Sequence, residues 1–432
     1  MGWFFKTQNM TTATKLKENT VSLEMINEAA ERLAGVVLRT PLQHSKRLSE
    51  RYGATVYLKR EDLQEVRSFK IRGAYNKISS LTDEEKKRGV VCASAGNHAQ
   101  GVAYSCAALK IKGVIFMPVV TPNQKIEKVK QFGKEFVEVR LVGNTFDEAS
   151  GEAQKFAREC NAVFVHPFND PLTIAGQGTI AKEIDEKLGG KLDYLFTPIG
   201  GGGLAAGLTS YFKEKNNPVK IIGCEPAGAA SMHSAINSGK VVTLDSIDTF
   251  VDGCAVKTVG NHTFSICEQN LDRVIIEPEG KICTSMIELY QNDGIVAEPS
   301  GALPVSCLDD MAGEIKGKVV VCMLSGGNND ILRYPEIMER SLVYLGRKHY
   351  FIIEFAQKPG QLRNFLNKAL GPTDDISRFE YIKKTNKEKG PALIGIELKD
   401  KADYEPLLER MRAIELNFKV LSSDDMLYQY LI

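Results

Sequence analysis

The chain has 432 residues, of which 43% are apolar and 25% charged, and its formal net charge is +1. These values are typical of a globular protein with more than one domain. They give no electrostatic basis for binding nucleic acid or an anionic membrane surface, and no apolar stretch reaches the length of a membrane-spanning helix.

Nine cysteines are scattered along the chain without a CxxC pair. An odd and unpatterned set is typical of reduced thiols in a cytoplasmic protein and argues against a disulfide framework or a zinc site. The first 20 residues lack the apolar core of a signal peptide, and we expect them to form a flexible tail.

From residue 21 to about residue 345, short apolar runs alternate with amphipathic helical stretches. In chain order, we expect strands over 89–95, 113–119, 192–199 and 318–325, and helices over 98–111, 121–133 (capped by Thr121) and 204–215. Val/Ile-rich strands separated by helices predict an α/β domain whose parallel sheet is covered on both faces. Ligands of such domains bind at the carboxyl ends of the strands.

The pattern changes towards the C-terminus. There the expected strands are 349–356, 376–384, 392–398 and 418–423, and the expected helices are 359–370 and 403–416. In the first of these helices, Leu362, Phe365, Leu366 and Ala369 are expected to share the buried face. The order βαββαβ predicts a ferredoxin-like α+β domain over residues 347–432.

Four consecutive glycines, residues 200–203, follow one of the expected strands and precede a helix that begins with Leu204. Such a run is costly in chain entropy, so the position requires a bare backbone. A Gly-rich turn between a strand and a helix N-terminus presents backbone N–H groups to an anion, and the helix dipole favours a phosphate there.

Three interpretations of this turn stay open at this point. Gly201, Gly203 and Ala206 satisfy the GxGxxA pattern of dinucleotide-binding folds, and Glu225 ends the next strand about where a ribose-binding acid is expected. That interpretation makes the chain a nicotinamide-dependent oxidoreductase. The second interpretation requires only one bound phosphate group, and the third is a tight turn without a ligand.

Lys70 is the most distinctive residue outside the glycine turn. It lies between Phe69 and Ile71 and close to Arg67 and Arg72. Partial desolvation and neighbouring cations favour the neutral amine of a lysine, and that form is a nucleophile for carbonyl groups.

Two further loops follow expected strands. CASAGNHAQG (92–101) opens a helix and forms a second anion site, to which Asn97 and His98 add side-chain donors. CMLSGGNND (322–330) ends a third strand with small polar groups, among them Ser325.

The SFK lysine, the SAGNHA loop, the GGGGL turn and the SGGN serine, in this order, resemble the landmarks of the fold-type II pyridoxal-phosphate enzymes. Among these, residues 24–340 are most similar to the threonine dehydratases (threonine ammonia-lyases). The resemblance implies a tryptophan-synthase-β-like catalytic domain over residues 21–345 with two α/β subdomains, the smaller one inserted at about 57–160. Residues 347–432 resemble the single ACT-like regulatory domain of the biosynthetic members.

The resemblance also implies a role for each landmark. Lys70 would carry pyridoxal 5'-phosphate as a Schiff base and then take the Cα proton of the substrate, while Asn97 would bind the ring hydroxyl oxygen and Ser325 would face the ring nitrogen. The residues implied in cofactor binding are Lys70, Phe69, Asn97, Gly200, Gly201, Gly202, Gly203, Leu204 and Ser325. The residues implied in substrate binding are Ser94, Ala95, Gly96, Asn97 and His98.

The implied reaction is the elimination of water from L-threonine and the release of ammonia, which gives 2-oxobutanoate in the first step of isoleucine biosynthesis. L-Serine would be accepted by the same site. Isoleucine and valine are the effectors implied for the ACT-like domain, and the implied assembly is a homotetramer. The turn over residues 358–362 either holds an effector carboxylate or is an ordinary strand–helix turn, and both explanations stay open.

Other activities stay as alternatives. Serine racemases share the lysine motif, but in them a serine in the position after Ser94 transfers the second proton, and this chain has Ala95 there. The resemblance therefore favours elimination. A nicotinamide-dependent oxidoreductase leaves Lys70 unexplained, and a non-catalytic amino-acid sensor leaves all four landmark loops unexplained.

Three acidic residues complete the candidates. Glu298, in EPSGA (298–302), is either an outer residue of the site or a strand-end charge. Asp248 and Asp252 faintly resemble a cation-binding segment of the racemases, but a solvated loop accounts for them, and we assign no metal site.

Overall fold

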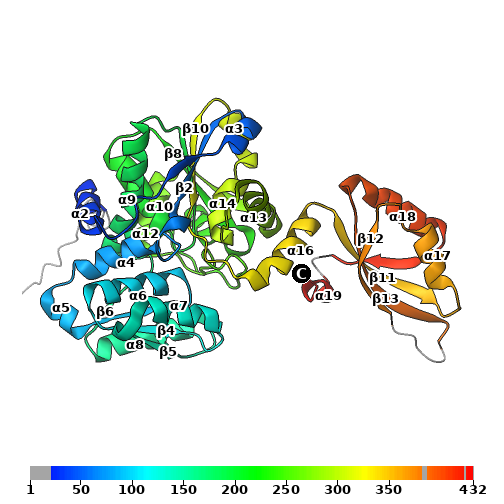
Figure 1. The fold of residues 1–432 in the computed structure, drawn as a ribbon, viewed down its shortest axis with the longest axis horizontal. Helices are drawn as coiled ribbons and strands as arrows, with labels where there is room; N and C mark the ends of the chain where they lie inside the picture. The colour runs from blue at the N-terminus through cyan, green and yellow to red at the C-terminus, as the bar shows by residue number, and fades with distance from the viewer. Residues whose placement is uncertain (1–20, 382–386, 423–424, 432) are drawn as a thin grey trace, which may run out of the picture. The chain divides into compact units, whose positions relative to one another are not determined.

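The structure, a computed structural model, describes residues 21–381, 387–422 and 425–431 (Figure 1). Contacts divide the chain into two compact units, Met1–Pro278 with Gly294–Asn329, and Glu279–Asp293 with Asp330–Ile432. The expected flexible tail, residues 1–20, lies outside the described residues.

A six-stranded sheet forms the centre of the first unit, as far as its residues are described. In spatial order its strands are β1 (Leu42–His44), β2 (Thr55–Arg60), β10 (Val319–Leu324), β7 (Tyr194–Pro198), β8 (Lys220–Pro226) and β9 (Arg273–Glu277). β1 is antiparallel to β2, and the other neighbouring strands are parallel. The strands β7, β8 and β10 are buried along nearly their whole length, as expected for a sheet covered on both faces.

A smaller parallel sheet lies in the same unit. In spatial order its strands are β5 (Val137–Leu141), β4 (Gly113–Met117), β3 (Val90–Ala93) and β6 (Val163–Phe164). Each sheet has its own apolar core, which confirms the expected α/β fold with two subdomains. The strands of the smaller sheet span residues 90–164, and β2 lies in the larger sheet. The expected limits of the smaller subdomain, about 57–160, stay a prediction.

Helices cover both sheets of this unit (Figure 1). They are α2 (Leu23–Leu33), α3 (Lys46–Tyr52), α4 (Lys70–Ser79), α5 (Asp83–Arg88), α6 (Asn97–Leu109), α7 (Asn123–Gly133), α8 (Phe146–Glu159), α9 (Pro171–Leu188), α10 (Gly203–Glu214), α11 (Ser231–Ser238), α12 (Asn261–Asn270), α14 (Pro299–Ser306) and α15 (Ala312–Ile315). α4 contacts α6 of the smaller subdomain and α9 of the larger one, so it joins the two.

The start of α7 differs from the expectation. Pro122, in an extended conformation, occupies the N-cap position, and no side chain caps the helix. Thr121 therefore lies one residue too early to act as the cap, and its buried hydroxyl has no hydrogen-bond partner within the described residues.

The second unit contains an antiparallel sheet and its crossover helices. The sheet has the order β12 (Asp375–Tyr381), β13 (Lys389–Glu397), β11 (Lys348–Ala356) and β14 (Asn417–Val420), with helices α17 (Gln361–Lys368) and α18 (Tyr404–Ala413) and a short final helix, α19 (Met426–Gln429). Neighbouring strands are antiparallel. This order confirms the expected ferredoxin-like βαββαβ module.

The buried face of α17 is narrower than expected. Phe365 and Ala369 are fully buried in the core of the module, but Leu362 and Leu366 are 42% and 41% exposed. Residues four positions apart lie on the same side of a helix, so Phe365 and Ala369 form one apolar stripe and Leu362 and Leu366 form the stripe beside it. Only the stripe of Phe365 and Ala369 is buried in the core of the module.

α13 (Glu279–Asp293) and α16 (Tyr334–Tyr344) also belong to the second unit. They pack against each other, and the hydroxyl groups of Thr284 and Ser341 lie 2.9 Å apart. A Cβ on Gly280 would lie 2.5 Å from that of Tyr344, so the helices approach closely. The expected limits of 21–345 and 347–432 place both helices in the catalytic domain; these limits stay a prediction.

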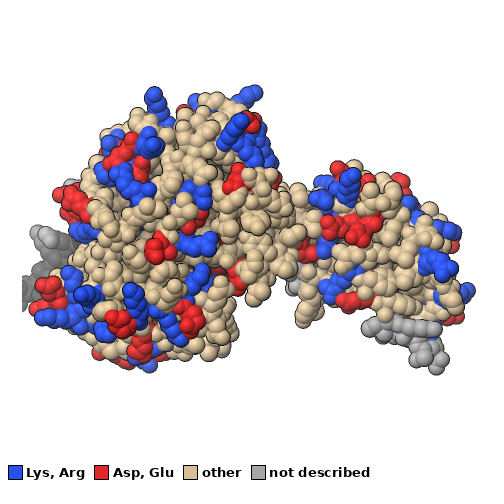
Figure 2. All heavy atoms as spheres, viewed as in Figure 1, with Lys and Arg blue, Asp and Glu red and all other residues tan. Residues whose placement is uncertain are grey.

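Basic and acidic side chains are interspersed on the face shown in Figure 2, without a large area of one sign. This mixture agrees with the net charge of +1. Among the described residues, no helix combines the length and the apolar character needed to cross a membrane.

Candidate active site

Lys70 is the first residue of α4 and directly follows Phe69 at the N-cap position. Its Nζ donates a hydrogen bond of 3.0 Å to the carbonyl oxygen of Pro167. The side chain is only partly exposed, and loss of hydration lowers the pKa of Lys70 to about 8. Because desolvation disfavours the ammonium form, a nucleophilic amine is available near neutral pH.

The loop after β10 lies directly beside this lysine. The backbone N–H of Phe69 donates to the carbonyl oxygen of Ser325 at 3.1 Å, and that of Gly327 donates to Arg67 at 3.0 Å. The hydroxyl group of Ser325, a residue only 1% exposed, has no hydrogen-bond partner within the described residues. An unpaired buried hydroxyl is costly, which indicates that a ligand atom is its partner.

The glycine turn lies between β7 and α10. The backbone N–H groups of Gly200 to Gly203 donate to no acceptor in the described part of the chain, and Gly202 has a φ of +90°. A Cβ on Gly201 would lie 2.3 Å from the ring of Phe168, and one on Gly203 would lie 2.9 Å from the Cα atom of Phe168. Close packing therefore requires the glycines, and their unpaired amides remain available to an anion.

Phe168 also connects this turn to the lysine, because the preceding Pro167 accepts the hydrogen bond from Lys70. His166 supports the segment: its Nδ1 accepts the backbone N–H groups of Phe168 and Asn169 at 3.2 and 2.9 Å. Burial lowers the pKa of His166 to about 4, so the ring is a neutral acceptor. This segment was not among the expected site loops, although FVHPFND (164–170) lies between a strand and a helix as the other loops do.

The loop from Ser94 to Asn97 is partly exposed. The backbone N–H of Gly96 donates to Ser94 Oγ at 3.2 Å, and a Cβ on Gly96 would meet no atom within 4 Å, so the loop borders open space. A Cβ on Gly101 in the same helix would lie 3.1 Å from the carbonyl carbon of Lys70. This loop therefore lies beside the lysine as well.

His98, by contrast, points into the core. It is 3% exposed, and its Nε2 bonds to the carbonyl oxygen of Val165 at 2.9 Å. Burial lowers the pKa of His98 to about 3, which keeps the ring neutral. Only the backbone N–H of His98, at the start of α6, can therefore take part in the expected substrate binding.

Asn97 is held by two residues from distant parts of the chain. Its Nδ2 lies 2.8 and 3.0 Å from the two carboxylate oxygens of Glu298, and its Oδ1 accepts a hydrogen bond of 2.8 Å from Asn328. Glu298 is 3% exposed, and burial raises the pKa of its carboxyl group. Glu298 is thus part of the hydrogen-bond network of the site and not a solvated strand-end charge.

Other acidic candidates are engaged elsewhere. The carboxylate of Glu225 accepts the backbone N–H groups of Met232 and His233, each at 2.8 Å, at the start of α11. It therefore acts as a helix cap, which removes the support for a ribose-binding acid. Asp252 pairs with Lys125 at 2.9 Å, and within the described residues no three His, Cys, Asp or Glu side chains gather as metal ligands.

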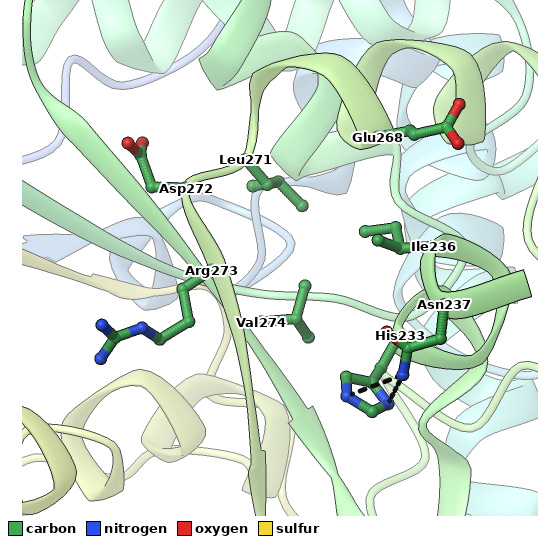
Figure 3. A pocket seen from close by; sticks show the side chains of 8 residues that line it. All are labelled: His233, Ile236, Asn237, Glu268, Leu271, Asp272, Arg273 and Val274. Carbon is green, nitrogen blue, oxygen red and sulfur yellow. Dashed lines mark hydrogen bonds between the residues drawn. The ribbon is translucent and has the colours of Figure 1, made fainter. Parts of the chain in front are cut away.

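Figure 3 shows a surface pocket in the first unit. It is lined by His233, Ile236, Asn237, Glu268, Leu271, Asp272, Arg273 and Val274. No expected site residue is among them. The four loops around Lys70, and not this pocket, form the candidate active site.

The chain is similar to known enzymes over nearly its whole length. Residues 33–326 match the family described as pyridoxal-phosphate dependent enzymes, and residues 339–431 match the C-terminal regulatory domain of threonine dehydratase. The biosynthetic L-threonine dehydratase IlvA of Halalkalibacterium halodurans is 53% identical to this chain over 412 residues, which cover 95% of this chain and 99% of the relative. The chain belongs to the threonine dehydratase family.

Solved structures show the same catalytic fold. Threonine deaminase isoform 2 of Solanum lycopersicum, in its processed form, is 37% identical with a TM-score of 0.70, over 74% of this dehydratase and 95% of that chain. A serine racemase of maize is 31% identical with a TM-score of 0.69, over 75% of this dehydratase and 99% of that chain. The fold is common to both activities, so the near full-length identity to IlvA and the regulatory domain decide the family.

The residues of the site fit the cofactor of this family. The amine of Lys70 suits an aldehyde, the unpaired amides of the glycine turn suit a phosphate, and the orphaned hydroxyl of Ser325 suits a ring nitrogen. Packing and hydrogen bonds place the loops that carry these groups around one lysine.

Proposed function

We propose that this dehydratase converts L-threonine to 2-oxobutanoate and ammonia with pyridoxal 5'-phosphate held at Lys70, as the first step of isoleucine biosynthesis. L-Serine is a second substrate and gives pyruvate. The observation that carries the proposal is the desolvated amine of Lys70, joined by packing and hydrogen bonds to loops that present unpaired polar groups.

Each loop holds one part of the cofactor. The amides of Gly200 to Gly203 and of Leu204 bind the phosphate at the N-terminus of α10, and the side chain of Phe69 adjoins the ring. Asn97 donates to the ring hydroxyl oxygen, and Ser325 Oγ pairs with the ring nitrogen. Bound there, pyridoxal phosphate supplies an electron sink for the charge that develops at the Cα atom of the substrate.

The amino acid binds at the start of α6. Its carboxylate accepts hydrogen bonds from Ser94 and from the backbone N–H groups of Ala95, Gly96, Asn97 and His98. The amine of Lys70 then takes the Cα proton, and its lowered pKa of about 8 suits a general base near neutral pH. The β-hydroxyl group leaves as water, and hydrolysis of the resulting enamine gives the oxo acid and ammonia.

Ser325 also favours elimination over reactions that need a long-lived carbanion. A hydroxyl group next to the ring nitrogen does not keep the ring protonated, as a carboxylate partner would. The electron sink is therefore weaker, which suits the expulsion of a β-hydroxyl because this step needs no long-lived carbanion.

Racemisation of L-serine is the second candidate, favoured only by the fold that the chain shares with a racemase. It needs a second proton donor on the opposite face of the substrate, and Ala95 provides none. Incubation with L-serine and resolution of the products tests this directly. We expect pyruvate and ammonia without D-serine, and D-serine as the main product would contradict the proposal.

Isoleucine as an inhibitor and valine as its antagonist are the effectors we propose for the ferredoxin-like module. The turn over residues 358–362 would hold the effector carboxylate, where Gly360, with a φ of +88°, begins α17 without a side-chain cap. Such control requires that the effector binds two states of a cytoplasmic homotetramer with different affinity. Isoleucine titration of the full chain, with and without valine, tests this part, and unchanged kinetics would contradict it.

A further inference from the structure

Glu298 is a buried carboxylate with neutral partners. It receives hydrogen bonds from Asn97 Nδ2 at 2.8 and 3.0 Å, from Ser300 Oγ at 2.8 Å and from the backbone N–H of Asn328 at 3.3 Å. None of the ion pairs within the described residues involves it. Burial of a carboxylate that forms no ion pair is costly, so its presence at this position calls for a purpose.

The purpose follows from the contacts of Asn97. A carboxylate only accepts hydrogen bonds, so the NH2 end of Asn97 must face Glu298. The oxygen end is fixed by Asn328, whose Nδ2 donates to Asn97 Oδ1 at 2.8 Å and to the carbonyl oxygen of Val66 at 2.8 Å. The amide therefore has one allowed orientation. Since one N–H can serve the carboxylate, the second N–H stays available to a ligand.

We infer that Glu298 is a positioning residue that acts through Asn97, holding the amide of Asn97 so that its second N–H is presented to the ring hydroxyl oxygen of the cofactor. The inference rests on the proposed function, because it assigns the cofactor contact to Asn97. Glu298 itself touches neither cofactor nor substrate in this account.

Glutamine cannot replace this carboxylate fully. A glutamine at 298 offers one acceptor oxygen to the N–H groups of both Asn97 and Asn328, and its own NH2 group faces one of them donor to donor. The amide of Asn97 then loses its fixed orientation. Ser300→Ala removes a different donor from the same carboxylate and leaves the Asn97 contact intact, which makes it the matched control.

The test compares Glu298→Gln and Ser300→Ala as full-length chains freed of cofactor. The Kd for pyridoxal phosphate is measured from the visible absorption of the bound cofactor, and the melting temperature of each cofactor-free chain is measured separately. We expect Glu298→Gln to raise the Kd about tenfold or more, the size of one hydrogen bond to a charged group, at nearly unchanged melting temperature. Ser300→Ala should change the Kd less than about twofold.

A wild-type Kd in Glu298→Gln would overturn the inference. It would also be overturned by an equal rise of the Kd in both variants that tracks their melting temperatures, since that is the result of a purely structural role. If Glu298→Gln does not fold, Asn328→Ala releases the other end of the Asn97 amide and must raise the Kd in the same way, or the inference fails. A wild-type chain that binds no cofactor would instead contradict the proposed function.

Discussion

The reactivity of Lys70 comes from the burial of its amine. Loss of hydration lowers its pKa, and the neighbouring Cys254 and Glu298 oppose this shift only in part. The amine also donates a hydrogen bond to the carbonyl oxygen of Pro167. This oxygen is an uncharged acceptor, so the contact is not an ion pair. A lysine in this setting is a nucleophile and base near neutral pH, as the proposed chemistry needs.

This burial predicts the pH dependence of cofactor attachment. The rate at which cofactor-free protein takes up pyridoxal phosphate should rise as the pH increases through about 8, because the neutral amine is the reacting form. Stopped-flow absorbance over a pH series measures it. A midpoint near 10.5, the ordinary value for lysine, would show that the amine is not desolvated.

The glycine turn gives a second prediction at this scale. Gly201→Ala places a Cβ 2.3 Å from the ring of Phe168, so it should cost about 1–3 kcal/mol of stability and displace the phosphate-binding amides. Gly151→Ala, at a helical position with open space around it, is the control and should cost nothing. Thermal unfolding of the two variants decides; equal stability would mean that Phe168 does not hold the turn.

The positions of Ser94, the glycine turn and Ser325 could be predicted from the sequence, because each follows an apolar strand, whereas Lys70 begins a helix. Their roles in the site stay predictions. Pro167 and Phe168 were missed, because their contacts with Lys70 and Gly201 join residues that are distant in sequence, 97 positions apart for Lys70 and Pro167, and depend on tertiary packing. Glu298 was a candidate from the sequence, but its partner Asn97, 201 residues away, could not be predicted. Local sequence patterns predict that a residue lies in a loop, but they do not predict which distant residue it contacts.

At the scale of elements, α4 is fixed by a buried cluster of charges. Arg72 donates to both carboxylate oxygens of Glu61 at 2.8 Å and to Glu183 in α9 at 2.7 Å. Lys59 in β2 pairs with the same Glu183. The two cations and two carboxylates join α4, which begins with Lys70, to the larger sheet and to α9.

Arg72→Met should therefore cost about 3–5 kcal/mol, because it leaves Glu61 buried without its main partner. Arg39→Met removes the ion pair with Glu186, whose side chains are 69% and 42% exposed, and should cost less than about 1 kcal/mol. Urea unfolding followed by circular dichroism compares them. Similar losses in the two variants would show that the cluster does not anchor α4.

The elements themselves were largely predictable, and their edges were not. Strand and helix positions follow from apolar periodicity, which the structure bears out for β3, β7, β10 and the ferredoxin-like order. The N-cap of α7 is Pro122 and not the expected Thr121, because the helix begins at Asn123. Leu362 turned out exposed because periodicity gives the width of an apolar stripe but not how much of it a sheet covers.

At the scale of the whole molecule, the chain crosses between its two compact units at 278–279, 293–294 and 329–330. α13 lies between two segments of the catalytic unit in sequence, yet it packs with α16 in the other unit. No compositional change marks this helix, so sequence alone could not assign it. The two compact units are therefore not simply consecutive in sequence, and the expected domain limits of 21–345 and 347–432 stay a prediction.

This division predicts how the chain tolerates truncation. A chain ending at Leu345 keeps α16 against α13 and should stay soluble, whereas one ending at Asn329 loses α16 and exposes the face of α13, around Gly280 and Thr284, that packs against it. Gel filtration of both truncated chains measures the difference. Equal solubility would show that α13 does not depend on α16.

The role of Lys70 as the residue that carries the cofactor can be tested by the visible absorption spectrum of the purified chain, recorded before and after addition of L-threonine. We expect a yellow band that shifts on addition while 2-oxobutanoate accumulates, and we expect Lys70→Ala to show neither change. A colourless chain that pyridoxal phosphate cannot reconstitute, or a Lys70→Ala variant that still turns over threonine, would contradict it.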